Sequence, residues 1–126
     1  MSGMWEKSQF AARSAKALVA LGDHDGAVNR AYYAIFCAAR AGRRFVHPDL
    51  DQSKTHAGVI RTFGKEMVQH EGLDPDLGRI IAKLERVRTS ADYDDVQLGR
   101  ATVDEVLDDM DFFLSAIAAF IAKPRT

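Results

Sequence analysis

The sequence predicts an all-α protein, a single domain over residues 1–126 folded as an up-and-down bundle of four or five helices. Apolar residues recur at helical spacing in successive segments, and no segment alternates apolar and polar residues as a half-buried strand would. The prolines Pro48, Pro75 and Pro124 stand between these segments or after the last one. The connections are short, which favours antiparallel neighbours.

Composition places the chain among ordinary globular proteins. Of its 126 residues, 47% are hydrophobic and 28% charged, and the net charge is −1. Near neutrality argues against a broad basic face for duplex DNA but leaves a local anion site open. The single Cys37 rules out an intrachain disulfide and a multi-cysteine zinc site. With no membrane-spanning apolar run and no secretory pattern at the N-terminus, we expect a cytoplasmic protein with no membrane partner.

The first two helices are expected on either side of Gly22. Alanine-rich residues 5–21 form the first, which Gly22 ends. Its expected inward row is Trp5, Ala12, Ala15 and Val19. Asp23 or Asp25 caps the second, which runs to about Arg43.

The second helix is apolar around most of its circumference, so it is expected at the centre of the bundle. Arg30, Tyr33 and Cys37 form a semi-polar row beside the apolar face, and the hydroxyls of Tyr32 and Tyr33 need hydrogen bonds if buried. A basic cluster at the end of this helix is expected to be solvated. It comprises Arg40, Arg43, Arg44 and His47.

Three more helices follow. Asp51 or Ser53 starts the third, whose apolar row is His56, Val59, Ile60, Phe63 and Met67. Asp74 as cap and Pro75 at the first position open the fourth. Thr102 and Glu105 make a capping box for the fifth.

One residue of the fourth helix breaks the pattern of its face. Leu77, Ile80, Ile81, Leu84 and Ala91 form an apolar stripe. Arg88 stands on the same row, where a buried and unpaired guanidinium would cost several kcal/mol. It therefore needs a partner or a partly open cleft. Tyr93 follows five residues later among aspartates.

Three segments, in order, resemble the signatures of a HEPN domain, the higher eukaryote and prokaryote nucleotide-binding family. They are NRAYYAIF at 29–36, KTH at 54–56 with Val59 and Phe63, and Arg88 followed by ADYD at 91–94. The chain is most similar to small prokaryotic single-domain members, over about residues 5–120. The resemblance implies a homodimeric bundle, commonly paired with a nucleotidyltransferase antitoxin in a toxin–antitoxin module. Active members are metal-independent endoribonucleases, so RNA or a nucleotide is the expected ligand, with no cofactor and no metal.

The family's ribonuclease motif is an arginine, four to six residues, then a histidine, with two copies meeting at the dimer interface. Here Arg88 matches the arginine, but Tyr93 stands where the histidine would be. Metal-free RNA cleavage needs a base for the 2′-hydroxyl proton, an acid for the leaving oxygen and a cation for the phosphorane. Arg88 suits phosphate, whereas tyrosine is a poor base at neutral pH. The candidate catalytic residues are Arg88, Tyr93 and Asp92.

Four further residues are candidates for nucleotide or RNA binding: Asn29, Arg30, Tyr33 and His56. Each has a structural alternative. His56 lies on an apolar row and can be a hydrogen-bonded core histidine. Arg30 can form an ion pair with another helix. Asp92 and Tyr93 can simply hold the chain as it leaves the fourth helix.

Two other functions remain open at this point. One is a non-catalytic HEPN module that binds a nucleotide or a nucleotidyltransferase, with Tyr33 or Tyr93 as acceptor of a transferred nucleotide. The other is a helical dimerisation scaffold. The sequence has no glycine-rich phosphate loop, no His-x-x-x-His or Glu-x-x-His metal pair and no Gly-x-Ser-x-Gly elbow.

Overall fold

A computed structural model describes residues 3–48, 56–93 and 98–123, and all regular structure in these ranges is helical. The elements are α1 (Gly3–Ala20), α2 (His24–Val46), α3 (His56–Phe63), the π-helical η1 (Gly64–His70), α4 (Pro75–Tyr93) and α5 (Arg100–Ala122). The predicted all-α bundle is therefore confirmed. Among the helices of the described ranges, none has both the length and the hydropathy needed to cross a bilayer.

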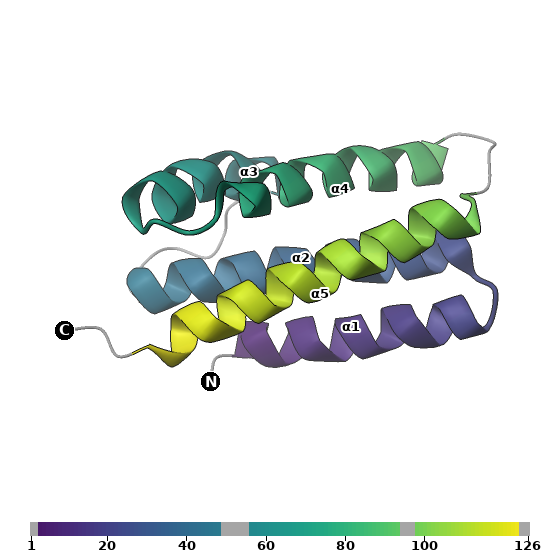
Figure 1. The fold of residues 1–126 in the computed structure, drawn as a ribbon, viewed down its shortest axis with the longest axis horizontal. Coiled ribbons are helices and arrows are strands. Elements are labelled where there is room, and N and C mark those ends of the chain that lie inside the picture. The colour runs from purple at the N-terminus through teal and green to yellow at the C-terminus, as the bar shows by residue number, and fades with distance from the viewer. Residues whose placement is uncertain (1–2, 49–55, 94–97, 124–126) are drawn as a thin grey trace.

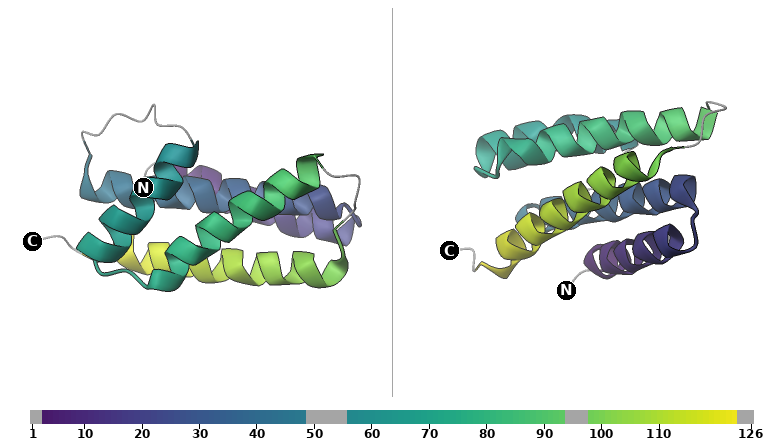
Figure 2. Two further views of the ribbon diagram at one scale, coloured as in Figure 1. Left: turned by 90° about the horizontal axis from the view of Figure 1, so that it is seen from above. Right: turned by 45° about the vertical axis from the view of Figure 1, so that its right-hand side comes forward.

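The helices pack around α2. In Figure 1 and Figure 2, α3 and α4 lie on one side of the bundle, α1 lies on the other, and α2 and α5 lie between them. The helix α2 contacts α1, α3, η1, α4 and α5. Its small residues allow this close approach. A Cβ atom on Gly42 would lie 3.3 Å from Cε of Met67 in η1 and 3.4 Å from Cδ1 of Ile117 in α5. The prediction of a central second helix is confirmed.

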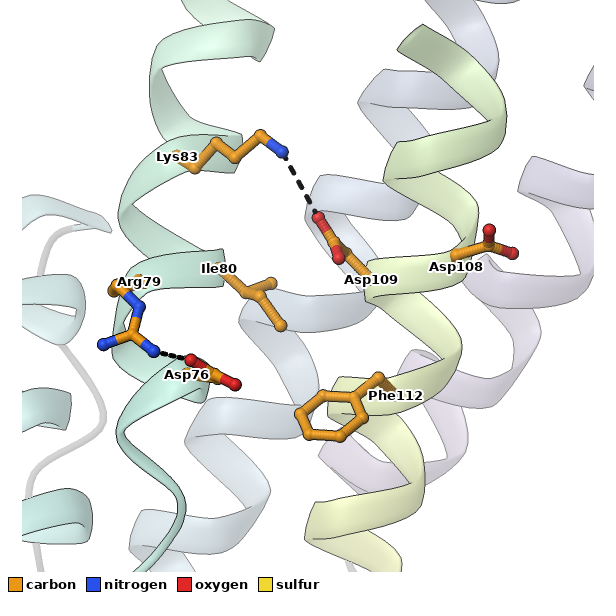
Figure 3. A pocket seen from close by; sticks show the side chains of 7 residues that line it. All are labelled: Asp76, Arg79, Ile80, Lys83, Asp108, Asp109 and Phe112. Carbon is orange, nitrogen blue, oxygen red and sulfur yellow. Dashed lines mark ion pairs between the residues drawn. The ribbon is translucent and has the colours of Figure 1, made fainter. Parts of the chain in front are cut away.

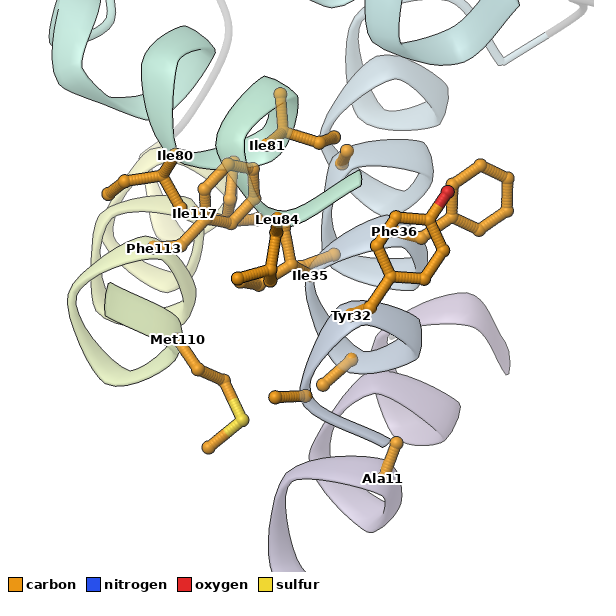
Figure 4. Close-up of a cluster of buried hydrophobic side chains, with 14 of the residues drawn as sticks. Ala11, Tyr32, Ile35, Phe36, Ile80, Ile81, Leu84, Met110, Phe113 and Ile117 are labelled. Atoms are coloured by element: carbon orange, nitrogen blue, oxygen red, sulfur yellow. The ribbon is translucent and has the colours of Figure 1, made fainter. Parts of the chain in front are cut away.

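The core surrounds α2 and includes buried residues from α1, α3 and η1, and much of it lies between α2, α4 and α5 (Figure 4). Fully buried side chains of all three helices meet there, among them Ile35, Leu84 and Met110. The ring centroids of Phe63 and Phe113 are 5.4 Å apart. Burial of about 25 cal/mol per Å² of apolar surface is the main favourable term in such a core.

Two predicted helix starts are confirmed by hydrogen bonds. Oδ1 of Asp23 accepts a bond of 2.9 Å from the backbone N–H of Gly26, which caps α2. Oδ1 of Asp74 accepts one of 2.9 Å from the backbone N–H of Asp76, just as α4 begins at Pro75. Gly22 ends the preceding turn with φ of 80°, a conformation that favours glycine.

The inward row of α1 differs from the prediction. Its buried residues are Trp5, Ser8, Ala11 and Ala15. The predicted members Ala12 and Val19 are only partly buried. The polar Ser8 can be buried because its hydroxyl donates a bond of 2.7 Å to the carbonyl of Ala34 in α2.

The third helix also differs from a continuous α-helix. Its predicted starts, Asp51 and Ser53, lie outside the described residues. After Phe63 the chain continues as π-helix through η1. A π-turn holds an extra residue, so apolar spacing alone does not reveal it. The predicted core residues Val59, Phe63 and Met67 are nevertheless buried.

The predicted capping box of the last helix is wrong. The helix α5 begins at Arg100 with Gly99 as N-cap, and no side chain caps it. Thr102 is consequently already inside the helix. Glu105 reaches α4 instead, where its carboxylate forms an ion pair with Lys83.

The basic cluster at the end of α2 is not uniformly solvated. The helix runs on to Val46, three residues beyond the predicted end, so Arg43 lies inside it. Arg43 is buried, and its Nε and Nη2 donate bonds of 2.8 Å and 3.3 Å to the carboxylate of Glu66 in η1. The prediction of a solvated end is therefore wrong for Arg43, because the acidic partner comes from a distant segment.

Candidate functional site at the contact of α2 and α4

Arg88 lies near the C-terminal end of α4, on the side that faces α2. The apolar stripe that precedes it is confirmed, since Leu77, Ile81 and Leu84 are fully buried. The side chain of Arg88 is 25% exposed. The side chain is thus partly buried and partly exposed to solvent, which is the arrangement that the break in the apolar pattern indicated.

Tyr32 and Glu85 both contact the Arg88 guanidinium. Its Cζ lies 4.6 Å from the centroid of the Tyr32 ring, a cation–π contact between α4 and α2. Its Nη2 lies 3.2 Å and 3.4 Å from the two carboxylate oxygens of Glu85, one turn earlier on α4. The charge on the apolar row is therefore compensated within the protein.

Tyr32 is the buried member of this group, with only 2% of its surface exposed. Burial, reinforced by a hydrogen bond to Glu85, raises the pKa of its hydroxyl, although Arg88 acts in the opposite direction. Tyr32 is therefore a neutral donor to Glu85. Figure 4 shows its ring beside Phe36, and the two ring centroids are 6.2 Å apart. We call Tyr32, Glu85 and Arg88 the Arg88 cluster.

Sequence reasoning identified Arg88 but did not place Tyr32 or Glu85 in the site. Two signals pointed to them. Glu85 stands three residues before Arg88, a spacing that brings side chains together on a helix. The Tyr32 hydroxyl needed a hydrogen-bond partner, but only the packing of α2 on α4 shows which one it has.

The candidate binding residues of α2 form a second group. Arg30 lies over the Tyr33 ring, with its Cζ 4.8 Å from the ring centroid. Both side chains are partly exposed, as is that of the neighbouring Asn29. Interaction with the Cys37 thiol raises the pKa of Tyr33. Tyr33 thus contacts residues of its own helix, whereas Tyr32 contacts α4, so the two tyrosines belong to different groups.

Three candidate residues have side chains outside the described part of the structure. They are His56, Asp92 and Tyr93. The backbone of His56 opens α3, and Asp92 and Tyr93 are the last residues of α4. Asp92 follows Arg88 by four residues in the same helix, which puts the two positions on one face. The roles predicted for these three residues stay predictions.

A pocket of about 490 Å³ opens elsewhere, between α4 and α5 (Figure 3). Its lining residues are Asp76, Arg79, Ile80, Lys83, Asp108, Asp109 and Phe112. Figure 3 shows the basic groups already paired, Arg79 with Asp76 and Lys83 with Asp109. The hydrogen bond that Lys83 donates to the Glu105 carboxylate raises the pKa of Lys83. This pocket holds none of the candidate residues, so we do not assign the chemistry to it.

Comparison with known proteins identifies the family. The sequence model of the HEPN domain family matches residues 1–119 of this chain. The chain belongs to the HEPN family. This confirms the resemblance carried by the three sequence segments and agrees with the all-α fold.

Relatives of this HEPN chain include two archaeal proteins from Methanocaldococcus jannaschii. It is 35% identical to "Putative toxin MJ0605" over 91 residues, covering 72% of the chain and 66% of the relative. It is 28% identical to "Putative toxin MJ0142" over 102 residues, covering 81% of the chain and 63% of the relative. The match therefore spans somewhat less than two thirds of each of these longer proteins. The UPF0332 protein glr0978 of Gloeobacter violaceus is 29% identical over 90 residues, 71% of the chain and 69% of the relative.

Proposed function

We propose that this protein is the toxin component of a two-gene toxin–antitoxin module and acts as a metal-independent endoribonuclease. The names of the two archaeal relatives support the toxin assignment. The observation that carries the nuclease assignment is Arg88, whose side chain is partly exposed and whose guanidinium contacts Tyr32 and Glu85. Such a fork fits the oxygens of a phosphate and the charge that develops on them.

In the proposed reaction, a base removes the proton of the RNA 2′-hydroxyl and the 2′-oxygen attacks the adjacent phosphorus. The bond from phosphorus to the 5′-oxygen breaks, and an acid protonates that oxygen. Arg88 stabilises the phosphorane. Asp92 is the candidate for the base and Tyr93 for the acid, since a tyrosine hydroxyl gives up a proton to an alkoxide. His56 is a further candidate for contact with RNA.

The proposal includes a homodimer through α2 or α4. In the family's ribonuclease motif two copies meet at the dimer interface, and one copy of this chain supplies a single Arg88. Asn29, Arg30 and Tyr33 lie on α2, where an exposed arginine over an aromatic ring can contact phosphate and base. Light scattering on the purified protein tests the dimer. A monomer at all concentrations used for cleavage would overturn this part.

The nuclease is tested with total RNA and purified protein in the presence of a chelator. Wild type is compared with Arg88→Ala and with Arg86→Ala, an exposed arginine on the same helix. We expect cleavage by wild type and by the Arg86 variant, and loss of at least about 100-fold for Arg88→Ala. Absence of cleavage by wild type would overturn the nuclease assignment.

The substitution Tyr93→His restores the spacing of the family motif. Histidine titrates near neutral pH, so we expect the variant to cleave faster than wild type. No gain, in a variant that folds normally, would argue against a catalytic place for position 93.

A second candidate function is a binding module for a nucleotide or a nucleotidyltransferase antitoxin, in which Tyr33 or Tyr93 accepts a nucleotide. The contact of Arg30 with the partly exposed ring of Tyr33 favours it. Incubation with a minimal nucleotidyltransferase and ATP, followed by mass spectrometry, tests the modification. Addition of a nucleotide to either tyrosine without any RNA cleavage would favour this second function.

A further inference from the structure

The Arg88 cluster joins a catalytic candidate to two residues that the cleavage chemistry does not require. Nη2 of Arg88 lies 3.2 Å from Oε1 and 3.4 Å from Oε2 of Glu85. The Tyr32 ring lies under the same guanidinium, with 4.6 Å between Cζ and the ring centroid. Arg88 therefore joins Tyr32 of α2 to Glu85 of α4, and Tyr32 is also hydrogen-bonded to Glu85.

The contacts restrict two different motions of the arginine. The Tyr32 ring against the guanidinium limits movement toward α2, whereas the Glu85 carboxylate at Nη2 limits rotation of the guanidinium. An arginine side chain otherwise loses much rotamer entropy when it is ordered on a ligand. One held in place beforehand loses less, and its donors already point where the charge will develop.

Tyr32 acts on Arg88 in two ways, because its hydroxyl also reaches Glu85. That hydrogen bond and burial both raise the pKa of Tyr32, so the group remains a neutral donor to the carboxylate. A phenylalanine would fill the same core space and contact Phe36 equally well. The substitution Tyr32→Phe therefore removes the hydroxyl and keeps the packing of the ring, so it tests the role of the hydroxyl alone.

We propose that Tyr32 and Glu85 are positioning residues, which hold the Arg88 guanidinium in its RNA-binding orientation before the substrate arrives. This inference rests on the proposed function, since it assigns to Arg88 a phosphate of RNA as ligand. Neither residue touches the RNA. Their effect passes entirely through Arg88.

The first experiment measures cleavage of a short oligoribonucleotide by wild type, Tyr32→Phe and Glu85→Gln. We expect kcat to fall about 10-fold and KM to rise about 3- to 10-fold in each variant, because a guanidinium that is not held in place binds the phosphate less well and also stabilises the phosphorane less well. Glu105→Gln is the matched control, since it removes a carboxylate that pairs with Lys83 of α4, outside the Arg88 cluster. It should leave kcat unchanged.

The second experiment is a double-mutant cycle on binding, which does not depend on cleavage. The probe is a 2′-O-methyl oligoribonucleotide, which has no 2′-hydroxyl and is not cut. We expect Tyr32→Phe and Glu85→Gln to raise Kd about 3- to 10-fold in the wild-type background and to have no effect once Arg88 is alanine. A purely structural role would give the same loss in both backgrounds.

The outcomes separate this inference from the proposed function. Binding without cleavage by wild type overturns the nuclease, and the binding cycle alone then decides the positioning role. Equal effects in the two Arg88 backgrounds, or kcat within 2-fold of wild type in both variants, overturn the positioning role. Absence of binding by wild type overturns both.

Discussion

Nε of Arg43 lies 2.8 Å from Oε2 of Glu66, in an ion pair whose arginine side chain is only 5% exposed. A second bond of 3.3 Å from Nη2 makes the pair bidentate. It joins the central helix α2 to the π-helical η1. A guanidinium is tolerated at this depth because the carboxylate compensates its charge. The pair thus fixes where η1 packs on α2.

Loss of the acidic partner should be strongly destabilising. In Glu66→Ala the buried Arg43 charge keeps its place but loses this carboxylate, and we expect the free energy of unfolding to fall by about 2–4 kcal/mol. Urea unfolding measures the change. Asp111→Ala is the control, because the Lys16–Asp111 pair is more than half exposed on both sides and should contribute less than about 1 kcal/mol. Equal losses would contradict the argument.

Two glycines should respond oppositely to substitution. Gly42 is enclosed by Met67 and Ile117, so Gly42→Leu should overpack the junction of α2, η1 and α5 and lower stability by about 1–3 kcal/mol. Nothing lies within 4 Å of a Cβ at Gly64. Gly64→Ala should therefore raise stability by about 0.5–1 kcal/mol through reduced backbone entropy of the unfolded chain. Thermal and urea unfolding of both variants test this, and a destabilised Gly64→Ala would be the contrary result.

The two predicted helix caps can be compared directly. Asp23→Ala removes the acceptor for the N–H of Gly26 and should destabilise the protein by about 1 kcal/mol. Thr102 lies within α5 and caps nothing, so Thr102→Ala should change stability by less than about 0.5 kcal/mol. The measurement is the urea midpoint at constant m-value. A loss of similar size for Thr102→Ala would restore the capping box.

Stability should fall at alkaline pH, partly because of Tyr32. Its pKa in the folded state is raised above the ordinary value of 10.0. Below pH 10 the hydroxyl is protonated in both states. Above it the unfolded chain loses the proton while the folded chain keeps it, so unfolding becomes more favourable as pH rises.

The check is the free energy of unfolding of wild type and Tyr32→Phe between pH 9 and pH 11. The wild-type curve should fall more steeply, by up to about 1 kcal/mol per pH unit, since the variant has no proton to release at this position. The other tyrosines and the lysines titrate in both proteins and cancel in the comparison. Parallel curves would mean that the pKa of Tyr32 is not raised in the folded state.

The sequence by itself determined the helical class, the central place of the second helix and the apolar stripe of α4. These depend on composition and periodicity, which are local properties of the chain. The caps at Asp23 and Asp74 were predictable for the same reason, because a cap bonds within its own first turn. The family resemblance likewise followed from the order of short segments, and the match over residues 1–119 confirms it.

The sequence predicted only part of the candidate site. Arg88 stood out because it broke the apolar row, but its partner Tyr32 is 56 positions away, in another helix. The buried ion pair of Arg43 with Glu66 likewise joins residues of different helices. So does the ion pair of Glu105 with Lys83 of α4, which stands in place of the predicted capping box. Periodicity shows which face of a helix is apolar but not which neighbour covers it. Only the packing of α2 against η1 and α4 decided which charges are buried together, because electrostatic partners are chosen by distance in space and not along the chain.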